Sequence, residues 1–247
     1  MASLGQIIFY SMIVLIVLFS VLIILLLALA FSGSSSEVSS TNTLPIANLS
    51  DDIILSCYLN VKLELAKLRE VSVTWEKKDL KGLVHHYHDG ADDLLDQDPQ
   101  FKGRTQVFPE ALGKGNASLL LRDVKKRDAG EYTCKISSSE GKGTVDINLR
   151  TAAFSAPKFT VIKGILFAVA NRWFPKPNVT WSDEAGNTLK GSSSFVQNSA
   201  GIYRVASSLQ PINISDTYVC RIENELVSAV SKATVSVDGD SQIPDWY

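Results

Sequence analysis

The chain has 247 residues, of which 45% are hydrophobic, and its 24 basic and 26 acidic side chains give a formal net charge of −2. This length exceeds that of one small domain and suits two domains of about 100–120 residues each. Nucleic-acid binding needs clustered Lys and Arg, so the balanced charge excludes nucleic acid as an expected partner. The short basic run Lys125, Lys126 and Arg127 is interpreted as a solvated loop before Asp128.

The N-terminal segment is almost entirely apolar. Residues 7–31 are interrupted only by Tyr10, Ser11 and Ser20, and the first charged side chain is Glu37. As a helix this stretch would extend roughly 36 Å, enough to cross a bilayer core of about 30 Å. The segment is therefore predicted to direct the chain into or across a membrane.

Two interpretations of residues 1–33 remain open, a signal peptide and a signal anchor. The small residues Ala30 and Gly33 favour cleavage, whereas the length and the absence of a basic start favour an uncleaved anchor that contacts the membrane. Both interpretations export the rest of the chain, so the expected location is extracellular, at the cell surface or secreted. Export also suits four glycosylation sequons of the Asn-x-Ser/Thr type, at Asn48, Asn116, Asn178 and Asn213.

Beyond this segment the sequence has the pattern of short β-strands. Residues 34–43 are Ser-rich and are predicted to form a flexible stalk. Residues 71–75, 118–122 and 144–149 alternate apolar and polar side chains, as strands with one buried face do. Turn signals such as Asp89 followed by glycine separate these runs. The pattern predicts an all-β protein built from two-layer sandwiches.

The first half contains the residue set of an immunoglobulin-type sandwich. In that fold two cysteines bridge the facing sheets, a tryptophan packs on the bridge, and a tyrosine two residues before the second cysteine bonds back to the backbone. The sequence supplies this set as Cys57, Cys134, Trp75 and Tyr132. The disulfide would stabilise the fold by roughly 4–5 kcal/mol on the chain-entropy model.

The second half repeats the set with one member missing. Trp181 and Tyr218 are its core aromatics and Cys220 its second cysteine, but the first cysteine, expected about thirteen residues before the tryptophan, is replaced by Ala168. Cys220 therefore has no partner in its own domain, and this domain is expected to be the less stable one. A buried thiol and an intermolecular disulfide remain open for Cys220, and its strand position favours the first.

The strand around Ala168 has a second unusual feature. If Ala168 faces inward, Phe167 and Val169 face outward, at an edge of the sandwich. Outward apolar residues on a strand indicate a contact surface, such as a domain–domain contact or a weak homodimer. Cover by a neighbouring loop or a glycan is the alternative interpretation.

These observations define the expected domains. We expect a variable-type immunoglobulin domain over residues 44–150, a constant-type domain over 156–238, and a polar tail over 239–247. Within the first domain, Arg104 is expected to form a salt bridge with Asp128 at the base of the sandwich.

Several motifs resemble those of butyrophilins and T-cell co-stimulatory ligands, a family of the immunoglobulin superfamily. Residues 171–177, which contain Trp-Phe-Pro-Lys-Pro, resemble the signature of their membrane-proximal domains. The segments that resemble their variable domains are residues 101–105, 115–119 and 128–134. The segments that are similar to a T-cell-inhibitory member are residues 1–7, 82–85 and 141–143.

The resemblance implies an immune regulatory ligand that binds a protein receptor on T cells and negatively regulates T-cell activation. A homophilic adhesion or structural surface glycoprotein is the alternative, because the same sandwiches serve both functions. The chain departs from the family in two places. Ala168 stands where the constant-type domains have cysteine, and the tail at 239–247 does not resemble the C-terminal anchor of that family.

The resemblance also implies a receptor-facing surface, which in this family is the front sheet of the variable domain. Strand alternation relative to Cys134 and Trp75 selects the outward side chains of that sheet, and residues 138–142 are expected to form its tip loop. The resulting receptor-binding candidates are Thr74, Glu76, His86, Lys135, Ser137 and Lys142.

All three histidines lie within residues 85–88. On a strand, His86 and His88 share a face, which leaves a metal site, a pH-sensitive edge and a plain exposed strand as interpretations. Two ligands are too few for a closed zinc site, so no metal is expected. The chain offers no Ser–His–Asp arrangement and no phosphate-binding glycine loop, so neither enzymatic activity nor a cofactor is expected. The acidic side chains interpreted as a solvated loop are Asp92, Asp93, Asp96 and Asp98.

Overall fold

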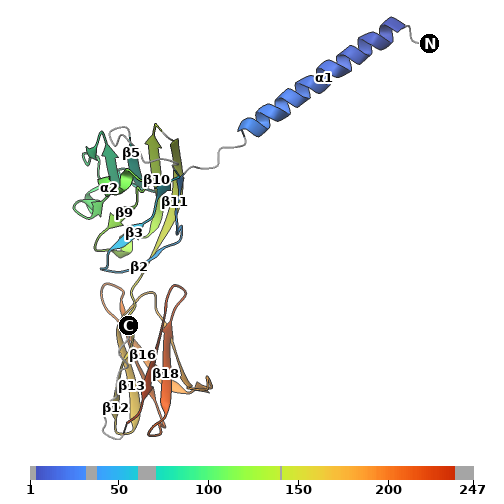
Figure 1. Ribbon diagram of the computed structural model, residues 1–247. Helices are drawn as coiled ribbons and strands as arrows, with labels where there is room; N and C mark the ends of the chain where they lie inside the picture. Colours follow the sequence, from blue (N-terminus) through green and yellow to red (C-terminus); the bar gives the residue numbers. More distant parts are fainter. Residues whose placement is uncertain (1–3, 32–37, 61–70, 140, 237–247) are drawn as a thin grey trace.

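The computed structural model describes residues 4–31, 38–60, 71–139 and 141–236, in which one long N-terminal helix precedes two β-sandwiches (Figure 1). Helix α1 spans Leu4–Phe31, which corresponds to about 42 Å at 1.5 Å per residue. Its stretch Phe9–Leu26 has a mean hydropathy of 3.0 and none of it is buried. By length and composition this helix is able to cross a membrane, and a signal sequence would have the same properties.

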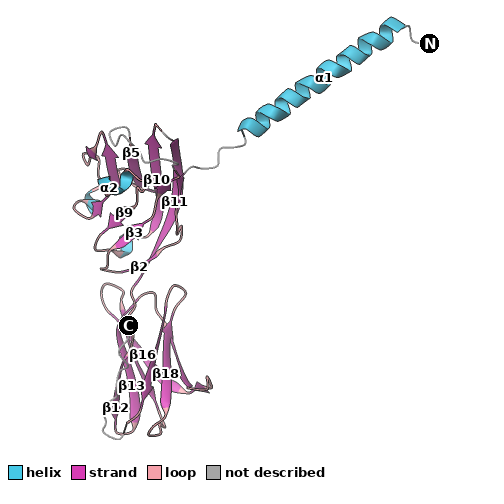
Figure 2. Cartoon of the chain, viewed as in Figure 1, coloured by secondary structure: helices cyan, strands magenta, loops and turns pink. Residues whose placement is uncertain are grey.

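In the first sandwich, the six-stranded sheet β2-β11-β10-β5-β6-β7 packs against the smaller sheets β3-β9-β8 and β1-β4 (Figure 2). Its strands are β1 Val38–Ser39, β2 Ile46–Asn48, β3 Ile53–Leu55, β4 Tyr58–Leu59, β5 Ser72–Lys77, β6 His85–His88, β7 Ala91–Asp92, β8 Thr105–Gln106, β9 Leu119–Leu121, β10 Gly130–Ser138 and β11 Gly141–Ala152. Within the described residues, three short helices connect these strands: η2 Pro99–Phe101, α2 Pro109–Leu112 and η3 Lys126–Asp128.

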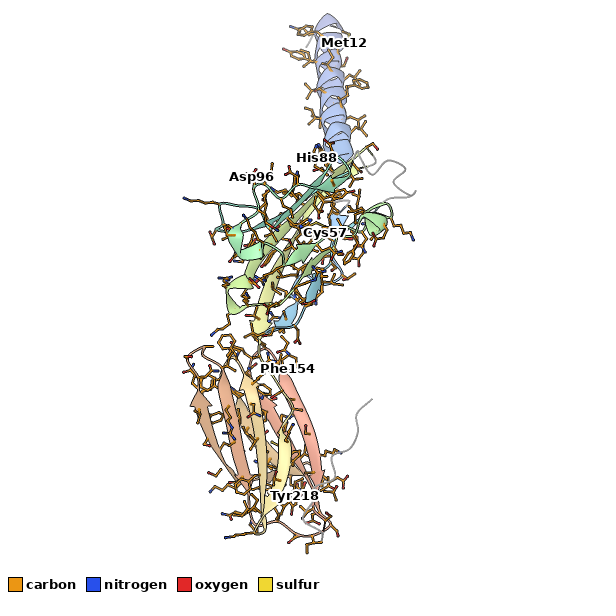
Figure 3. All side chains as sticks on the ribbon, turned by 90° about the vertical axis from the view of Figure 1, so that its left-hand side faces the viewer. Met12, Cys57, His88, Asp96, Phe154 and Tyr218 are labelled. Atoms are coloured by element: carbon orange, nitrogen blue, oxygen red, sulfur yellow. A yellow bond between two sulfur atoms is a disulfide. The ribbon has the colours of Figure 1, made fainter. Side chains whose placement is uncertain are left out.

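The core of the first sandwich is organised around its disulfide. Cys57 and Cys134 are bonded at 2.06 Å, and Trp75 lies directly opposite Cys134 on the neighbouring strand (Figure 3, Cys57). The fully buried Trp75 ring donates its Nε1–H to the carbonyl of Ala117 at 3.0 Å, so its one polar atom is satisfied. Successive side chains of a strand point to opposite faces, so the residues next to this inward pair on each strand point outward.

The base of the first sandwich contains a buried charge. The Tyr132 hydroxyl donates to the carbonyl of Asp128 at 2.6 Å, and the fully buried Asp128 carboxylate forms an ion pair with Arg104. Arg104 also donates to the carbonyls of Gln100 and Arg122, so its guanidinium bonds to two segments besides the carboxylate. Removing either charged partner would leave a buried charge without compensation, which destabilises strongly.

The predicted stalk at residues 34–43 does not extend to its C-terminal half. Val38 is buried and pairs with Leu59, which makes β1 part of the sandwich. The hydroxyl groups of Ser40 and Thr41 both bond to Ser56, at 2.8 Å each. Serine-rich composition indicated flexibility, but in residues 38–43 these hydroxyls have protein partners. Residues 34–37 lie outside the described part of the chain.

The second sandwich packs sheet β12-β13-β17-β16 against sheet β15-β14-β18-β19. Its strands are β12 Lys158–Ile162, β13 Ile165–Trp173, β14 Asn178–Asp183, β15 Thr188–Leu189, β16 Gly191–Gln197, β17 Tyr203–Leu209, β18 Thr217–Glu223 and β19 Ser228–Thr234. Trp181 lies opposite Cys220 and donates its Nε1–H to the Ser207 hydroxyl at 2.8 Å. A side chain at Gly191 would collide with the Trp181 ring, so close packing requires glycine there.

Cys220 is a free thiol in the core of the second sandwich. Both Cys220 and Ala168 are fully buried, and burial raises the pKa of the thiol to about 12. A thiol with this pKa remains protonated at neutral pH and reacts slowly with disulfides. Its position in the core favours the interpretation of a buried thiol over that of an intermolecular disulfide.

A close junction joins the two sandwiches, near Phe154 (Figure 3). Ala153 and Phe174 exchange two backbone hydrogen bonds, at 3.0 and 2.8 Å. The Lys126 ammonium lies 3.8 Å from the centre of the Phe174 ring and donates to the carbonyl of Ala200 at 3.3 Å. Lys126 is solvent-exposed, as the interpretation of a solvated loop requires, and it also contacts the second domain.

The family signature at residues 171–177 is located at this junction. Fully buried Trp173 donates its Nε1–H to the carbonyl of Ser155 in the linker at 3.1 Å. The Arg172 guanidinium donates to the carbonyl of Leu49 in the first domain. Phe174 also packs against the core of the first domain, so the signature fixes the linker and both neighbouring domains.

Restoring the missing cysteine is predicted to stabilise the second domain. Ala168→Cys is expected to form a disulfide with Cys220 and to increase the free energy of unfolding by up to about 4 kcal/mol on the chain-entropy model. Thermal unfolding and thiol titration under denaturing conditions measure both effects. Ala170→Cys, equally buried on the same strand but two residues away, is the control and should keep two free thiols. A titre of two thiols in the Ala168 variant would contradict the prediction.

Replacing Phe174 at the junction by alanine is predicted to let the two domains unfold independently. Phe174→Ala removes the cation–π contact, which contributes about 0.5–1 kcal/mol, together with the apolar contact to the first domain. We expect separate calorimetric transitions for the two domains and a broader distribution of shapes in small-angle scattering. Phe195→Ala is the matched control, because Phe195 has Lys176 at 5.1 Å from its ring but packs within the second domain. Identical effects of both substitutions would refute the coupling role.

Candidate functional site

The candidate site is the outward face of the six-stranded sheet, hereafter the front face (Figure 2). Inward Cys134 and Trp75 leave the alternate side chains of β10 and β5 outward, where they are half-buried on β5 and half-buried or exposed on β10. The structure places all six receptor-binding candidates on this face, with Thr74 and Glu76 on β5, His86 on β6, Lys135 and Ser137 on β10, and Lys142 on β11.

The front-face candidates bond to one another across the strands. Lys135 donates to Glu76 at 2.7 Å, and both side chains are close to half exposed. The hydroxyl of Thr74 and Nδ1 of His86 are 3.0 Å apart. An exposed ion pair contributes only about 0–1 kcal/mol to stability, so a partner is able to reorganise this pair at little cost to the fold.

Sequence reasoning left the β11 part of this face unassigned. Thr133, which alternation places outward, donates to Asp146 on β11 at 2.7 Å, and Thr144 lies opposite Lys135. The alternation in residues 144–149 identified the strand, and the same alternation would have identified Thr144 and Asp146 as outward positions. The predicted tip loop is also shorter than expected, since Ser138 already pairs with Gly141 and places Lys142 within β11.

A hollow of about 460 Å³ lies beside the front face, at the turn after β5. Its walls carry charges of both signs, including Lys77, Lys78 and Glu131. Lys78 and Glu131 form an exposed ion pair at 2.8 Å, and this hydrogen bond and charge raise the pKa of Lys78. The mixed charges give this hollow no preference for a ligand of one sign.

The histidine cluster divides into one buried and two exposed rings. His85 is fully buried, with Nδ1 3.0 Å from the Thr105 hydroxyl and Nε2 3.1 Å from the Asp92 carboxylate. Because the Asp92 carboxylate only accepts, the neutral ring donates from Nε2 to Asp92 and accepts at Nδ1 from the Thr105 hydroxyl. Gln97 donates to the same hydroxyl at 2.8 Å, and the Val84 carbonyl is a second acceptor for it at 3.5 Å. Asp92 is exposed, as expected of a solvated loop, and one of its carboxylate oxygens also bonds to the buried His85 ring.

The other two imidazoles form an outward pair. The rings of His86 and His88 are stacked with centroids 5.9 Å apart, on the face that the alternation predicted (Figure 3, His88). Among the described residues, no group of three metal-binding side chains exists. Asp98 also has a structural role, because its carboxylate accepts from the backbone N–H of Gln100 and caps η2.

The buried histidine is predicted to make the first domain sensitive to acid. Burial lowers the pKa of His85 below its ordinary value of 6.5, against the attraction of Asp92. The unfolded chain therefore binds a proton more readily below pH 6.5, and the stability present above that pH is lost as the pH falls. His85→Gln, which keeps a donor near Asp92, is expected to weaken the dependence of thermal unfolding between pH 7.5 and 5. Exposed His88→Gln is the control, and an unchanged slope in the His85 variant would contradict the assignment.

Comparison with family models assigns both domains. Residues 41–151 match the immunoglobulin V-set domain, and residues 166–232 match the butyrophilin subfamily 3 member A2-like Ig-C domain. The crystal structure of bovine butyrophilin superposes with a TM-score of 0.58 at 20% identity, covering 83% of this chain and all of that chain, which supports the fold.

Curated relatives extend the match to nearly the whole chain. V-set domain-containing T-cell activation inhibitor 1 from Rattus norvegicus is 38% identical over 252 residues, covering 98% of this chain and 87% of the relative. The Homo sapiens protein of that name is 38% identical over 96% of this chain and 86% of its own length. Human butyrophilin-like protein 2 is 26% identical over 83% of this chain and 43% of its length. The chain therefore belongs to the butyrophilin/B7 family of the immunoglobulin superfamily, a family of non-enzymatic surface ligands.

Proposed function

We propose that this chain is a ligand that binds a protein receptor on T cells through its front face and negatively regulates T-cell activation. The observation that carries the proposal is the 38% identity to V-set domain-containing T-cell activation inhibitor 1 over both domains and the N-terminal helix. The helix and the family membership also support delivery through the secretory pathway to the cell surface or the medium.

The positions of the proposed glycosylation sites support use of the front face. Asn178 and Asn213 are exposed in the second domain, and Asn116 lies in the first domain outside the six-stranded sheet. Asn48 lies at the edge strand β2, where its side chain bonds to Asp51 and to the backbone N–H of Phe154 at the junction. Glycans at these four positions would leave the centre of the front face accessible.

The chemistry of the front face supports a polar protein partner. The Lys135 ammonium, the Glu76 carboxylate and the neutral polar groups of this face bond to one another. A receptor with complementary polar groups is able to replace these bonds, so that few charges are left unpaired in the interface. Paired surface groups of this kind favour specificity and association rate over affinity.

The test reverses one ion pair on the front face. The double variant Lys135→Glu with Glu76→Lys keeps the pair but exchanges the positions of its two charges, and is expected to lose suppression of stimulated T-cell proliferation. The full chain is expressed in animal cells and presented on them, or immobilised from the medium if it is released. Export and an intact Cys57–Cys134 disulfide show that each variant is folded.

The matched control reverses an ion pair of similar exposure in the second domain. Arg221 and Glu223 form a pair at 3.6 Å whose side chains are 49% and 43% exposed, against 47% and 40% for Lys135 and Glu76. Arg221→Glu with Glu223→Arg should suppress like the wild type. Loss of suppression only in this control would move the receptor site to the second domain. If the wild type binds other cells carrying the same chain and leaves proliferation unchanged, the chain is an adhesion protein and the proposal is wrong.

A further inference from the structure

The turn that follows β7 holds an apolar side chain almost entirely in solvent. This turn, residues 93–97, is hereafter the leucine turn. Its Leu95 is 91% exposed, more than any other large hydrophobic side chain among those the structure describes, helix α1 included. The neighbouring Leu94 is 36% exposed. Transfer of such a side chain from water into an apolar site is favourable, so a partner that covers Leu95 gains affinity from it.

The leucine turn is attached at both ends to the β6 segment. The backbone N–H of Asp93 donates to the His86 carbonyl at 2.9 Å, and the backbone N–H of Leu83 donates to the Asp96 carbonyl at 2.9 Å. Gln97, at the end of the turn, is buried, and its backbone N–H closes the turn on a carbonyl three residues earlier. The backbone that carries the two leucines is therefore held in place from both sides.

Gly82 allows the leucine turn to approach this closely. A side chain at Gly82 would place its first carbon 3.0 Å from the Asp96 carbonyl oxygen and 2.9 Å from the backbone nitrogen of Asp98. Both distances are shorter than a carbon atom tolerates, so the attachment requires glycine at this position. Because the backbone is already fixed, a partner that binds Leu95 does not have to order the turn, which lowers the entropic cost of binding.

The outward apolar residues of the second domain differ from Leu95. Phe167 and Val169 point outward on β13, as the alternation predicted, but both are half-buried. The expectation that their strand lies at an edge of the sandwich was wrong, because β13 lies between β12 and β17. Neighbouring strands therefore flank these side chains, whereas Leu95 lies beyond the last strand of its sheet.

Carboxylates border the leucine turn. Residues 82–101 include five aspartates and neither lysine nor arginine. Asp93 and Asp96, which lie on either side of the two leucines, are exposed, and neither forms an ion pair within the described part of the chain. On the front face, by contrast, Lys135 is paired with Glu76. The leucine turn therefore combines an apolar centre with a border of net negative charge.

The leucine turn lies within the reach of a partner bound on the front face. It follows β7, which is two strands from β5 in the sheet order, or about 10 Å at 4.8 Å per strand. An interface with the standard area of about 800 Å² per partner measures roughly 30 Å across. Asp96 and His88 both lie at the end of the first domain away from the second domain, where neither is covered by it (Figure 3).

We propose that the receptor on T cells that binds the front face also receives Leu95, in an apolar pocket bordered by lysine or arginine side chains. The inference rests on the proposed function, because the partner is the same receptor. Carboxylates beside a buried leucine lose part of their hydration, so a pocket without cations would oppose binding. Cations on the rim compensate this loss and accelerate the approach of the two proteins.

The border charge also decides against two other occupants of the leucine turn. An anionic lipid surface attracts cations and repels carboxylates. The same turn of a second copy would place carboxylates against carboxylates, which repel each other. A cationic protein surface with an apolar recess satisfies both the leucines and the aspartates.

Truncation of the exposed leucine tests the pocket. The full chain is displayed on animal cells, or immobilised from the medium, at graded densities, and the density that gives half-maximal binding of stimulated T cells is measured. Leu95→Ala is expected to raise this density about tenfold or more, since a buried leucine contributes an effect of that order. Leu95→Met keeps the apolar volume and should bind like the wild type.

The matched control for the truncation is Ile54→Ala. Ile54 is 57% exposed on β3, in the opposite sheet of the same domain, and its truncation should leave T-cell binding unchanged. Neither truncation is expected to alter thermal unfolding much, because both side chains are largely in solvent. Equal losses of binding in the Leu95→Ala and Ile54→Ala variants would overturn the proposal.

Neutralising the border tests the predicted cations. Binding of the wild type should weaken as NaCl rises from about 30 to 150 mM in buffers kept isotonic with sucrose, because salt screens exposed charges. Asp93→Asn with Asp96→Asn should bind less well at low salt and depend less on NaCl. Glu184→Gln with Glu225→Gln removes two exposed carboxylates from the second domain and is the control. Equal salt dependence of the wild type and the Asp93/Asp96 variant would contradict the cationic rim.

The same assay separates failure of this inference from failure of the proposed function. If the front-face variant Lys135→Glu with Glu76→Lys loses T-cell binding while Leu95→Ala binds normally, the proposed function stands and the inference is wrong. If the wild type does not bind stimulated T cells at any density, both are wrong. Selective loss in the Leu95→Ala variant, with binding restored in Leu95→Met, supports the inference.

Discussion

The opposition of Trp75 and Cys134 on β5 and β10 is the constraint on which the rest of the first domain depends. The disulfide and the tryptophan together fix which face of the six-stranded sheet is buried. Because successive side chains of a strand point to opposite faces, the buried pair also determines which residues form the front face, and Glu76 and Lys135 contact each other there. A shift of one residue in either strand would bury charges and expose the core, so the fold enforces the register of the candidate site.

The second domain achieves the same arrangement by packing and hydrogen bonding. Trp181 again lies opposite a cysteine, but its ring is held by the Ser207 hydroxyl and by the close approach of Gly191. Without the covalent bridge, more of its stability comes from side-chain packing around Leu166 and Val205, which are fully buried. The junction adds contacts from the first domain, so the weaker sandwich is supported at one end.

Local patterns predicted the fold well, because they depend on spacing along the chain. Spacing of Cys57, Trp75 and Tyr132 indicated the sandwich, and alternation placed the front-face candidates and the outward position of Phe167. These inferences need only the strand period and one inward reference residue. They required no knowledge of which distant segments meet.

The contacts that the sequence did not reveal are those between a side chain and a partner on another strand or in another domain. Lys126 is solvated, as expected, but the sequence did not reveal that it also contacts Phe174 and Ala200 of the other domain. Ser40 looked like part of a linker, but its hydroxyl bonds to Ser56. Asp92 lies seven residues from His85, and only the β6–β7 hairpin brings them together. Composition cannot reveal such partners, since the same residues would be solvated in another topology.

The buried thiol has a consequence for the maturation of the chain. Three cysteines in an oxidising compartment allow three pairings, and two of them would link Cys220 to the first domain. Folding of the second domain places Cys220 in its core and leaves Cys57 and Cys134 as the only accessible pair. Correct oxidation of one domain thus depends on how quickly the other one closes. Substitutions that delay folding of the second sandwich would appear as mispaired product of the first.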